Sequence, residues 1–376
     1  MKKENILNII IIGVFVLIIF MPQITFFFAK SYLETDTSEN RKLAEKPQFE
    51  YKTITKYPEK YNSYYNDNLP FRGYLKKAWT NINLFIFNDS TNKNVLLGKK
   101  ENNNLKEMWL FYCSESDGNP VDEVQGITNF TKEQKEQMYK TIVQNTETLA
   151  QKNIRLYYLI CPDKENIYKE NLPDTIRVSG ESRTDKLVDE LRKKGVTNII
   201  YPKEELLREK ENGQLYYKQD THWNFFGAFT GYKNAMNVIE PNLECYDYTV
   251  EWEKNKVQNR DLINMLGKSN FFVDDEPTIN YFNDITYKTS TIKTETNQIE
   301  ITECQNSLVD NTIMIIGDSY RSAMIPYFAR TYKKCIFLHK TDFSNELVEK
   351  YAPDSIIIEN VERYTFGTIS NIKMNK

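Results

Sequence analysis

The chain has 376 residues, of which 40% are hydrophobic and 27% are charged, with 13 Gly and 12 Pro. This composition excludes collagen-like, low-complexity and wholly disordered proteins, and the length allows about two domains or one large domain with insertions. The formal net charge is −3, so no overall basic field points to nucleic acid as a partner. Five cysteines without C-x-x-C spacing and only two histidines give no recognisable metal motif, and we predict no metal site.

The amino-terminal segment is predicted to be a membrane anchor. From Ile6 to Ala29 nearly all residues are apolar, and at about 1.5 Å per residue this stretch can cross a hydrocarbon core of about 30 Å. Lys2 and Lys3 precede it, so the positive-inside tendency places the amino terminus in the cytoplasm and the rest of the chain outside the cell. The alternative is a cleaved signal peptide, although the apolar stretch is long for one and no clear A-x-A site follows.

Changes in composition predict the domain organisation. Residues 1–5 form a cytoplasmic tail, 6–29 the transmembrane anchor, 30–94 a polar, Tyr-rich extracellular arm or stalk, and 95–376 the catalytic domain. Within that domain, residues 242–310 lack helical periodicity and are rich in Thr, Asn and Tyr. We interpret them as a β-rich or loop insertion.

Short apolar strands alternate with helices along the predicted catalytic domain. The pattern predicts strands at 95–98, 109–112, 154–160, 198–201, 312–316, 335–338 and 355–358, and helices at 131–152, 184–194, 203–211, 224–239, 319–332 and 344–351. This alternation is typical of an α/β fold with a parallel sheet flanked by helices. Functional groups in such sheets lie beyond the carboxyl ends of the strands.

A serine in a strand-to-helix turn is the first candidate for chemistry. Gly317-Asp318-Ser319-Tyr320 follows a predicted strand and precedes a predicted helix. Free backbone N–H groups at the start of a helix can stabilise an oxyanion, and Gly317 permits a tight turn. Ser319 is therefore a candidate nucleophile. The alternative is that Asp318 or Ser319 only caps the helix.

The segment Asp220-Thr221-His222-Trp223-Asn224 supplies a candidate base. In an extended segment, residues two apart point to the same side, so Asp220 is expected to orient the His222 imidazole. His222 would then act as a general base toward a serine. The other histidine, His339, has no acid two residues away, which makes His222 the preferred base. The alternative is a surface histidine beside a helix cap formed by Asp220 or Asn224.

Together these motifs resemble the alginate O-acetyltransferase family, which includes AlgJ/AlgX-like proteins and the DHHW group and is SGNH-hydrolase-like. Asp-Thr-His-Trp precedes Gly-x-Ser-Tyr in the order that this family shares, whereas ordinary SGNH hydrolases place the serine first. The resemblance covers most of residues 35–365 and includes short matches at 39–44 with Pro47, 68–72, 109–112, 162–164 with Tyr168 and Pro173, and 359–363. It implies an SGNH-like α/β domain with Ser319, His222 and Asp220 as a catalytic triad.

Further site residues follow from the same resemblance. The chain has no Gly-x-Asn-Asp block, so the usual asparagine donor of an SGNH oxyanion hole cannot be assigned. Arg321, Lys164 and Arg363 are candidate replacements, and for each the alternative is a surface ion pair. Tyr320 and Trp223 are candidates to line the acceptor cleft, because their rings offer a sugar an apolar face and a polar edge.

The resemblance implies O-acetylation of a cell-surface or secreted polysaccharide through an acetyl-Ser319 intermediate, with no cofactor. It also implies a membrane-bound O-acyltransferase partner as the acetyl donor, because soluble acetyl-CoA is lacking outside the cell. A carbohydrate acetylesterase with the same triad and a non-catalytic polysaccharide-binding or assembly subunit remain as alternatives. We expect a single-pass cell-membrane protein with an extracellular catalytic domain.

Overall fold

The computed structural model describes residues 3–29, 43–69, 72–243, 248–267, 271–281 and 284–375. Some features discussed above lie outside these residues: Lys2, most of the motif at 39–44, Pro70 and Phe71 of the 68–72 motif, and parts of the 242–310 segment. The chain divides into two units, Met1–Thr91 and Asn92–Lys376. All candidate site residues belong to the second unit.

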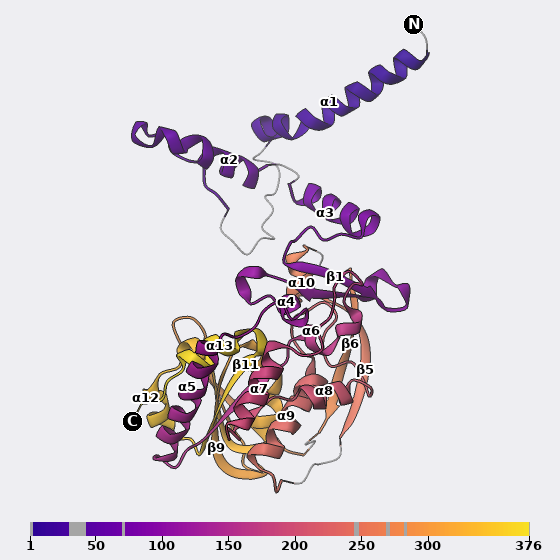
Figure 1. Cartoon of the computed structure of the whole chain (residues 1–376). Helices are drawn as coiled ribbons and strands as arrows, with labels where there is room; N and C mark the ends of the chain where they lie inside the picture. Colours follow the sequence, from indigo (N-terminus) through magenta and orange to yellow (C-terminus); the bar gives the residue numbers. More distant parts are fainter. Residues whose placement is uncertain are drawn as a thin grey trace. The chain divides into compact units, whose positions relative to one another are not determined.

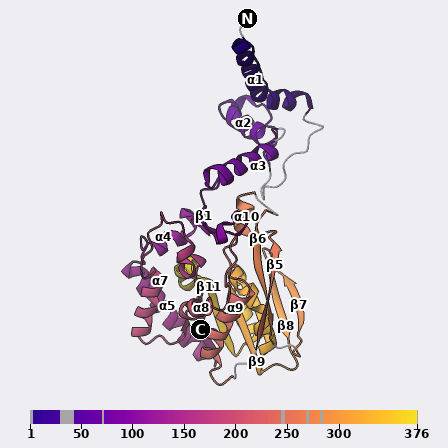
Figure 2. The ribbon, with the colours of Figure 1, turned by 90° about the vertical axis from the view of Figure 1, so that its right-hand side faces the viewer.

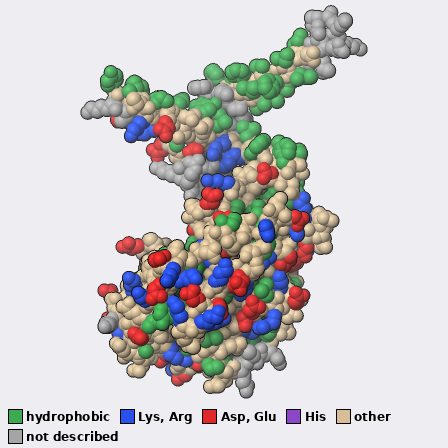
Figure 3. Space-filling model, viewed as in Figure 1, with side chains coloured by type: hydrophobic (Ala, Val, Ile, Leu, Met, Phe, Trp, Pro, Cys, Tyr) green, Lys and Arg blue, Asp and Glu red, His purple; other side chains and the backbone are tan. Residues whose placement is uncertain are grey.

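The first unit is helical over most of its described length. Its helices are α1 (Lys3–Ala29), η2 (Tyr51–Lys56), α2 (Tyr57–Asp67), α3 (Arg72–Ile82) and the π-helix η3 (Asn83–Phe87). Within the described residues, α1 is the one helix long and apolar enough to cross a membrane, over Asn8–Phe26 with a mean hydropathy of 2.7. Exposed hydrophobic side chains follow it along its length (Figure 3). The helix is compatible with a single-pass anchor.

A seven-stranded sheet forms the centre of the second unit (Figure 1, Figure 2). In spatial order its strands are β4 (Ile199–Ile200), β3 (Arg155–Cys161), β11 (Ser355–Val361), β9 (Val309–Gly317), β10 (Tyr332–His339), β8 (Gln298–Glu303) and β7 (Lys288–Lys293). The strands from β4 to β10 run parallel, whereas β8 is antiparallel to both β10 and β7. The sheet is therefore mixed, and the expectation of a parallel sheet holds only for its first five strands.

The central strands are apolar on both sides because helices cover both faces of the sheet. Along β9, Ile313 and Ile315 pack into one hydrophobic core, and Met314 and Ile316 into the other. The first core includes side chains of α8 (Lys203–Glu209), α9 (Phe225–Ile239) and α11 (Ile325–Thr331), and the second those of α5 (Lys132–Ala150), α7 (Arg183–Lys193), α12 (Asn345–Tyr351) and α13 (Thr365–Asn371). Successive side chains of a strand point to opposite faces, so a continuous apolar run is the pattern of a strand buried on both sides.

Two smaller antiparallel pairs accompany the main sheet. They are the hairpin of β1 (Val95–Lys100) and β2 (Met108–Tyr112) and the ribbon of β5 (Thr249–Lys256) and β6 (Val273–Asn280). The short helices α4 (Pro120–Val124), α6 (Lys164–Ile167) and α10 (Asp261–Met265) complete the unit. The segment predicted as a β-rich insertion thus supplies the β5–β6 ribbon, α10, and the β7–β8 hairpin that adds to the edge of the main sheet at β10.

The predicted helix at 319–332 is shorter than expected. It begins as the 3₁₀-helix η8 (Ser319–Met324), and the α-helix starts only at Ile325, with Pro326 in its first turn. Proline is favoured there because its missing N–H is not needed in the first turn of a helix. Ser319 is therefore the first residue of a tight 3₁₀ turn, directly after β9.

Candidate active site

Ser319 stands where the carboxyl end of β9 turns into η8. Gly317 is required there, because a Cβ atom at this position would lie 2.1 Å from Glu359 Oε2 on the neighbouring β11. The Asp318 carboxylate accepts a hydrogen bond from the Tyr320 N–H at 3.1 Å, which fixes the turn. Ser319 itself is exposed to solvent.

His222 lies on a tight loop whose two ends meet. Tyr216 and Trp223 form an isolated antiparallel bridge at its base, and the Asn224 side chain then caps the amino end of α9. At the tip, Asp220 Oδ1 accepts a hydrogen bond from the His222 N–H at 3.0 Å. Asp220 and His222 therefore meet through a bend, and not through the extended segment that was expected.

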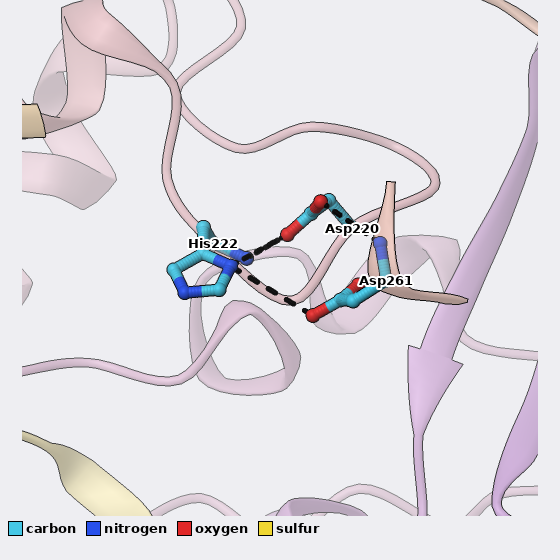
Figure 4. A group of neighbouring side chains, drawn as sticks. All are labelled: Asp220, His222 and Asp261. Atoms are coloured by element: carbon cyan, nitrogen blue, oxygen red, sulfur yellow. Dashed lines mark hydrogen bonds and ion pairs between the residues drawn. The ribbon is translucent and has the colours of Figure 1, made fainter. Parts of the chain in front are cut away.

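A continuous hydrogen-bond chain joins Asp220, His222 and Ser319. Asp220 Oδ1 lies 2.6 Å from Nδ1 of His222 (Figure 4), and Nε2 of His222 lies 2.7 Å from Ser319 Oγ. With a proton on Nδ1, the imidazole donates to Asp220 and presents the Nε2 lone pair to the serine hydroxyl. A histidine in this arrangement can remove the serine proton.

The charges of the site favour the His222 tautomer that carries its proton on Nδ1. Although burial opposes its ionisation, the His222 ring and the N–H groups of His222 and Asp261 lower the pKa of Asp220 to about 2. Burial also opposes protonation of His222, but the hydrogen bond and charge of Asp220, with the charge of Asp261, raise the pKa of His222 above its ordinary value. The Arg363 charge acts in the opposite direction. The ionised Asp220 thus stabilises an imidazolium when His222 takes up a proton.

A second carboxylate, from Asp261 at the start of α10, lies beside this pair (Figure 4). Its Oδ2 is 3.7 Å from His222 Nδ1, and its backbone N–H donates to Asp220 Oδ2 at 3.1 Å. Asp261 was not predicted from the sequence, because it is 41 positions beyond Asp220 in a segment without periodicity. No motif distinguishes it from the other acidic residues of that segment.

Asp220, His222 and Asp261 present possible metal ligands, since their polar atoms lie within 4.8 Å of one another. However, the 2.6 Å contact between His222 Nδ1 and Asp220 Oδ1 is a hydrogen-bond distance. Each ligand of a transition metal ion lies about 2 Å from the ion, which occupies the space between them. The contact is therefore read as a hydrogen bond within the Asp220–His222 pair, and we assign no metal to this group.

Lys164 is buried beneath the His222 loop and supports it. Its Nζ donates to the carbonyl oxygen of Asp220 at 2.6 Å and to those of Tyr217 and Lys218, both at 3.2 Å. Burial lowers the pKa of Lys164, and nearby carboxylates, first among them Glu165, oppose this effect. Because its three donors are used by backbone carbonyls, Lys164 cannot serve as the oxyanion donor that was expected.

Tyr320 and Trp223 form the floor of the site and do not line a cleft. Each is only 1% exposed. The Trp223 Nε1–H donates to the Tyr320 carbonyl oxygen at 3.0 Å, and the Tyr320 hydroxyl donates to the carbonyl oxygen of Thr221. The Tyr320 ring lies 4.9 Å from the His222 ring, between centroids. The expectation that these two aromatic residues contact an acceptor sugar is therefore wrong, because both are buried: Tyr320 packs against His222, and Trp223 packs against Tyr320.

Ser319 opens into a cleft of about 1130 Å³. Its wall includes three cationic side chains and three aromatic ones, which are Arg183, Lys340, Arg363, Phe130, Tyr364 and Phe366. This volume exceeds that of most pockets for a single small molecule, which are about 300–1,000 Å³. Cationic groups lie over two of these rings: the Arg183 guanidinium over Phe130 and the Lys340 ammonium over Tyr364, at 4.7 and 4.5 Å from the ring centroids.

The two arginines predicted as oxyanion donors differ in position. Arg321 does not line the cleft, and its Nη1 donates to the Asp318 carbonyl oxygen at 2.6 Å. Arg363 lines the cleft and is held by Asp163, which accepts hydrogen bonds from its guanidinium and from its backbone N–H. Its side chain is 8% exposed, and its Nε has no hydrogen-bond partner within the described part of the chain. Arg363 therefore brings a positive charge to the cleft wall, held in place by Asp163.

A family model for the SGNH hydrolase-like domain of the acetyltransferase AlgX matches residues 106–329, which is more than half of the chain. The chain belongs to this family. The AlgX-type domain includes the His222 loop, Asp261 and the Ser319 turn, and the family resemblance expected from the sequence is confirmed. The family supports an acetyltransferase with an SGNH-hydrolase-like fold. No curated protein sequence matches the chain.

Solved structures also resemble the AlgX-type domain. Bacillus cereus PatB1 has 17% sequence identity and a TM-score of 0.56, over 74% of this chain and 100% of that chain. PatB1 with a sulfonyl adduct has 18% identity and a TM-score of 0.54, over 74% and 99%. The O-acetyltransferase domain of Pseudomonas putida AlgJ has 17% identity and a TM-score of 0.47, over 75% and 94%. At these identities the PatB1 structures support the fold alone.

Proposed function

We propose that this protein is a membrane-anchored O-acetyltransferase that modifies a cell-surface or secreted polysaccharide. The observation that carries the proposal is the hydrogen-bond chain from Asp220 through His222 to Ser319, which ends on an exposed serine in a large cleft. Membership of the AlgX family supports acetyl as the transferred group. In the proposal Ser319 is the nucleophile, His222 the general base, and Asp220 the residue that fixes the imidazole tautomer.

The first step is acetylation of Ser319. His222 Nε2 accepts the hydroxyl proton while Ser319 Oγ forms a bond to the acetyl carbonyl carbon of the donor ester. The tetrahedral intermediate then loses the donor oxygen, which takes the proton from the imidazolium. The products are acetyl-Ser319 and the donor alcohol, with a neutral His222.

The second step transfers the acetyl group to the acceptor. A sugar hydroxyl gives its proton to His222 Nε2 and attacks the carbonyl carbon of acetyl-Ser319. When the bond to Oγ breaks, the imidazolium returns the proton to Ser319, and the acetylated sugar leaves. Negative charge develops on the carbonyl oxygen in both steps, and Arg363, with its positive charge in the cleft wall, is our candidate to stabilise it.

The cleft wall suits a carbohydrate acceptor. Phe366, beside the cationic side chains of the wall, supplies a ring on which the apolar side of a sugar can pack. A bound sugar hydroxyl has a large effective concentration over bulk water, which favours transfer over hydrolysis. We propose that these residues hold the acceptor beside acetyl-Ser319.

The proposed acetyl donor is a membrane-bound O-acyltransferase that delivers acetyl groups across the bilayer. We propose that α1 anchors the protein with its amino terminus in the cytoplasm and the AlgX-type domain outside the cell, so that the site stays near such a donor. The apolar length of α1 and the lysines before it support this orientation.

A carbohydrate acetylesterase is the second candidate function. Ser319 is exposed, so water can also reach an acetyl-serine at this position. The esterase would use the same triad and the same first step, and it differs only in the hydroxyl that resolves the intermediate. A purely non-catalytic role in polysaccharide binding has less support, because the chain from Asp220 to Ser319 is complete.

Acetyl transfer to offered oligosaccharides tests the proposal. The full chain in detergent micelles is given p-nitrophenyl acetate with a panel of oligosaccharides, and the sugars are analysed by mass spectrometry. We expect acetylated oligosaccharide from the wild type and none from Ser319→Ala. Removal of acetyl groups from an acetylated glycan, without transfer to any sugar, would support the esterase instead.

A further inference from the structure

The carboxylate of Asp261 touches the Asp220–His222 pair but has no part in the mechanism proposed above. We propose that Asp261 is a positioning residue, which braces the loop that carries the pair and supplies a second negative charge to the His222 imidazolium. The inference rests on the proposed function, because it concerns how His222 is prepared to act as a base toward Ser319.

Reciprocal hydrogen bonds join Asp261 to the His222 loop. The Asp261 N–H donates to Asp220 Oδ2 at 3.1 Å, while Asp261 Oδ1 accepts from the Thr221 N–H at 2.9 Å. The Thr221 hydroxyl donates to the other oxygen, Oδ2. A backbone N–H of the His222 loop thus donates to the Asp261 carboxylate, and the backbone N–H of Asp261 donates to the Asp220 carboxylate. This pairing fixes both carboxylates relative to the imidazole.

The hydrogen bond from the Asp261 N–H helps to fix the orientation of the Asp220 carboxylate. One of its oxygens, Oδ1, is used by the His222 ring and N–H, and the other accepts from Asp261. With both oxygens held, the Asp220 carboxylate cannot rotate away from Nδ1. The orienting acid of the proposed triad is therefore itself oriented by the 242–310 segment, which contains neither Asp220 nor His222 nor Ser319.

Asp261 also acts on His222 through its charge. Its Oδ2 lies 3.7 Å from Nδ1, too far to accept the proton that Asp220 binds at 2.6 Å, but close enough to stabilise an imidazolium (Figure 4). The charged groups that act on His222 are Asp220 and Asp261, which favour its protonation, and Arg363, which opposes it. The Asp261 side chain is 36% exposed, so solvent screening limits the effect.

Titration of the histidine rings by NMR tests the inference without requiring turnover. The chain has only two histidines, so histidine-selective ¹⁵N labelling of the full chain in detergent micelles gives two sets of ring signals. The spectrum of His339→Gln assigns these signals, because that variant keeps only the ring signals of His222. We expect Asp261→Asn to lower the pKa of His222 by about one unit, since it removes the charge but keeps an oxygen for Thr221. The midpoint of the acid limb in the pH profile of p-nitrophenyl acetate cleavage should shift to lower pH by the same amount.

Two further variants separate charge from structure. Asp284→Asn is the matched control, because it removes an exposed acid from the same segment, and it should leave the His222 pKa unchanged. Asp261→Glu, which keeps the charge, should return the His222 pKa toward the wild-type value. If Asp261→Asn does not fold, Asp261→Ser replaces it, with the same expected shift.

The outcomes distinguish this inference from the proposed function. A folded Asp261→Asn or Asp261→Ser protein whose His222 pKa equals that of the wild type would overturn the inference, even if the enzyme transfers acetyl groups. Conversely, a shifted pKa in a protein that shows no Ser319-dependent activity would support the role of Asp261 toward His222 and contradict the proposed function.

Discussion

In the proposed mechanism, Ser319 has the ordinary reactivity of a hydroxyl until His222 removes its proton, so we expect the loss of either side chain to have the same effect. We expect Ser319→Ala and His222→Ala each to slow acetyl transfer by about 10³-fold or more, because triad members act as a unit. Ser322→Ala is the matched control, since Ser322 is also an exposed serine of η8. Initial rates with p-nitrophenyl acetate measure the effect. A Ser319→Ala rate near that of the wild type would leave Ser319 with a structural role only.

The pH dependence of the reaction follows from the same histidine. His222 can act as a base only when it is neutral, and its pKa is raised above the ordinary value of 6.5. Activity should therefore rise with pH through this raised pKa, and the midpoint of the acid limb of kcat/KM should lie above 6.5. A profile that is already flat well below that pH would show that another group controls the acid limb.

Short motifs made part of the site predictable from the sequence. Asp220 and His222 are two positions apart, and Ser319 follows an apolar strand directly, so each pattern can be recognised locally. Asp261 reaches the site only through the packing of a distant segment, which no local pattern reports. Tyr320 was misassigned because its residue type suits a sugar, whereas its burial under His222 depends on tertiary structure.

At the scale of elements, the contact between β9 and β11 places the serine turn. We expect Gly317→Ala to destabilise the protein by about 1–3 kcal/mol, because the added Cβ would lie 2.1 Å from Glu359 Oε2 and force the strands apart. Gly180→Ala is the control, since a Cβ at Gly180 meets nothing within 4 Å. Thermal unfolding of the purified proteins measures the difference. Equal melting temperatures for the two variants would mean that Glu359 moves aside at little cost.

The His222 loop depends on Lys164 in a similar way. Lys164→Met keeps the apolar stem but leaves the carbonyl oxygens of Tyr217 and Asp220 without this donor, which should cost about 3 kcal/mol. The Lys218 carbonyl oxygen keeps a hydrogen bond from the Leu110 N–H. Acetyl transfer should fall as well, since Asp220 loses its support. Lys193→Met, at a side chain that is 74% exposed, should change neither quantity. Unfolding in urea and initial rates test both expectations, and unchanged stability in Lys164→Met would contradict them.

Periodicity predicted the parallel core of the sheet but not its antiparallel edge. The strands β3, β9, β10 and β11 each contain a continuous apolar run, because both faces of these runs are covered. By contrast, every residue of β7 is exposed, and its polar sequence has no apolar run or hydrophobic alternation. The β7–β8 hairpin joins the sheet because Ile299 and Ile301 of β8 pack into one of its cores, a contact that only the tertiary structure determines.

At the scale of the whole molecule, the first prediction concerns membrane topology. If α1 is an uncleaved anchor, a reporter that works only outside the cytoplasm should be active when fused to the carboxyl terminus. The mature protein should also keep the Ile6–Ala29 segment, as mass spectrometry of the isolated protein can establish. The same reporter fused before Lys2 is the control and should be inactive. Recovery of a processed chain without that segment would favour the signal peptide.

The position of β11 has a consequence for how the chain folds. This strand lies between β3 and β9 as the third of the seven strands, and the contact between Cys161 and Glu359 joins residues 198 positions apart. During synthesis, β3 emerges long before the neighbour that completes its pairing. Its open edge can meanwhile pair with other chains, a hazard of sheets with distant strand neighbours. A chaperone that keeps the nascent chain extended would therefore matter more for this protein than for one whose adjacent strands are made in succession.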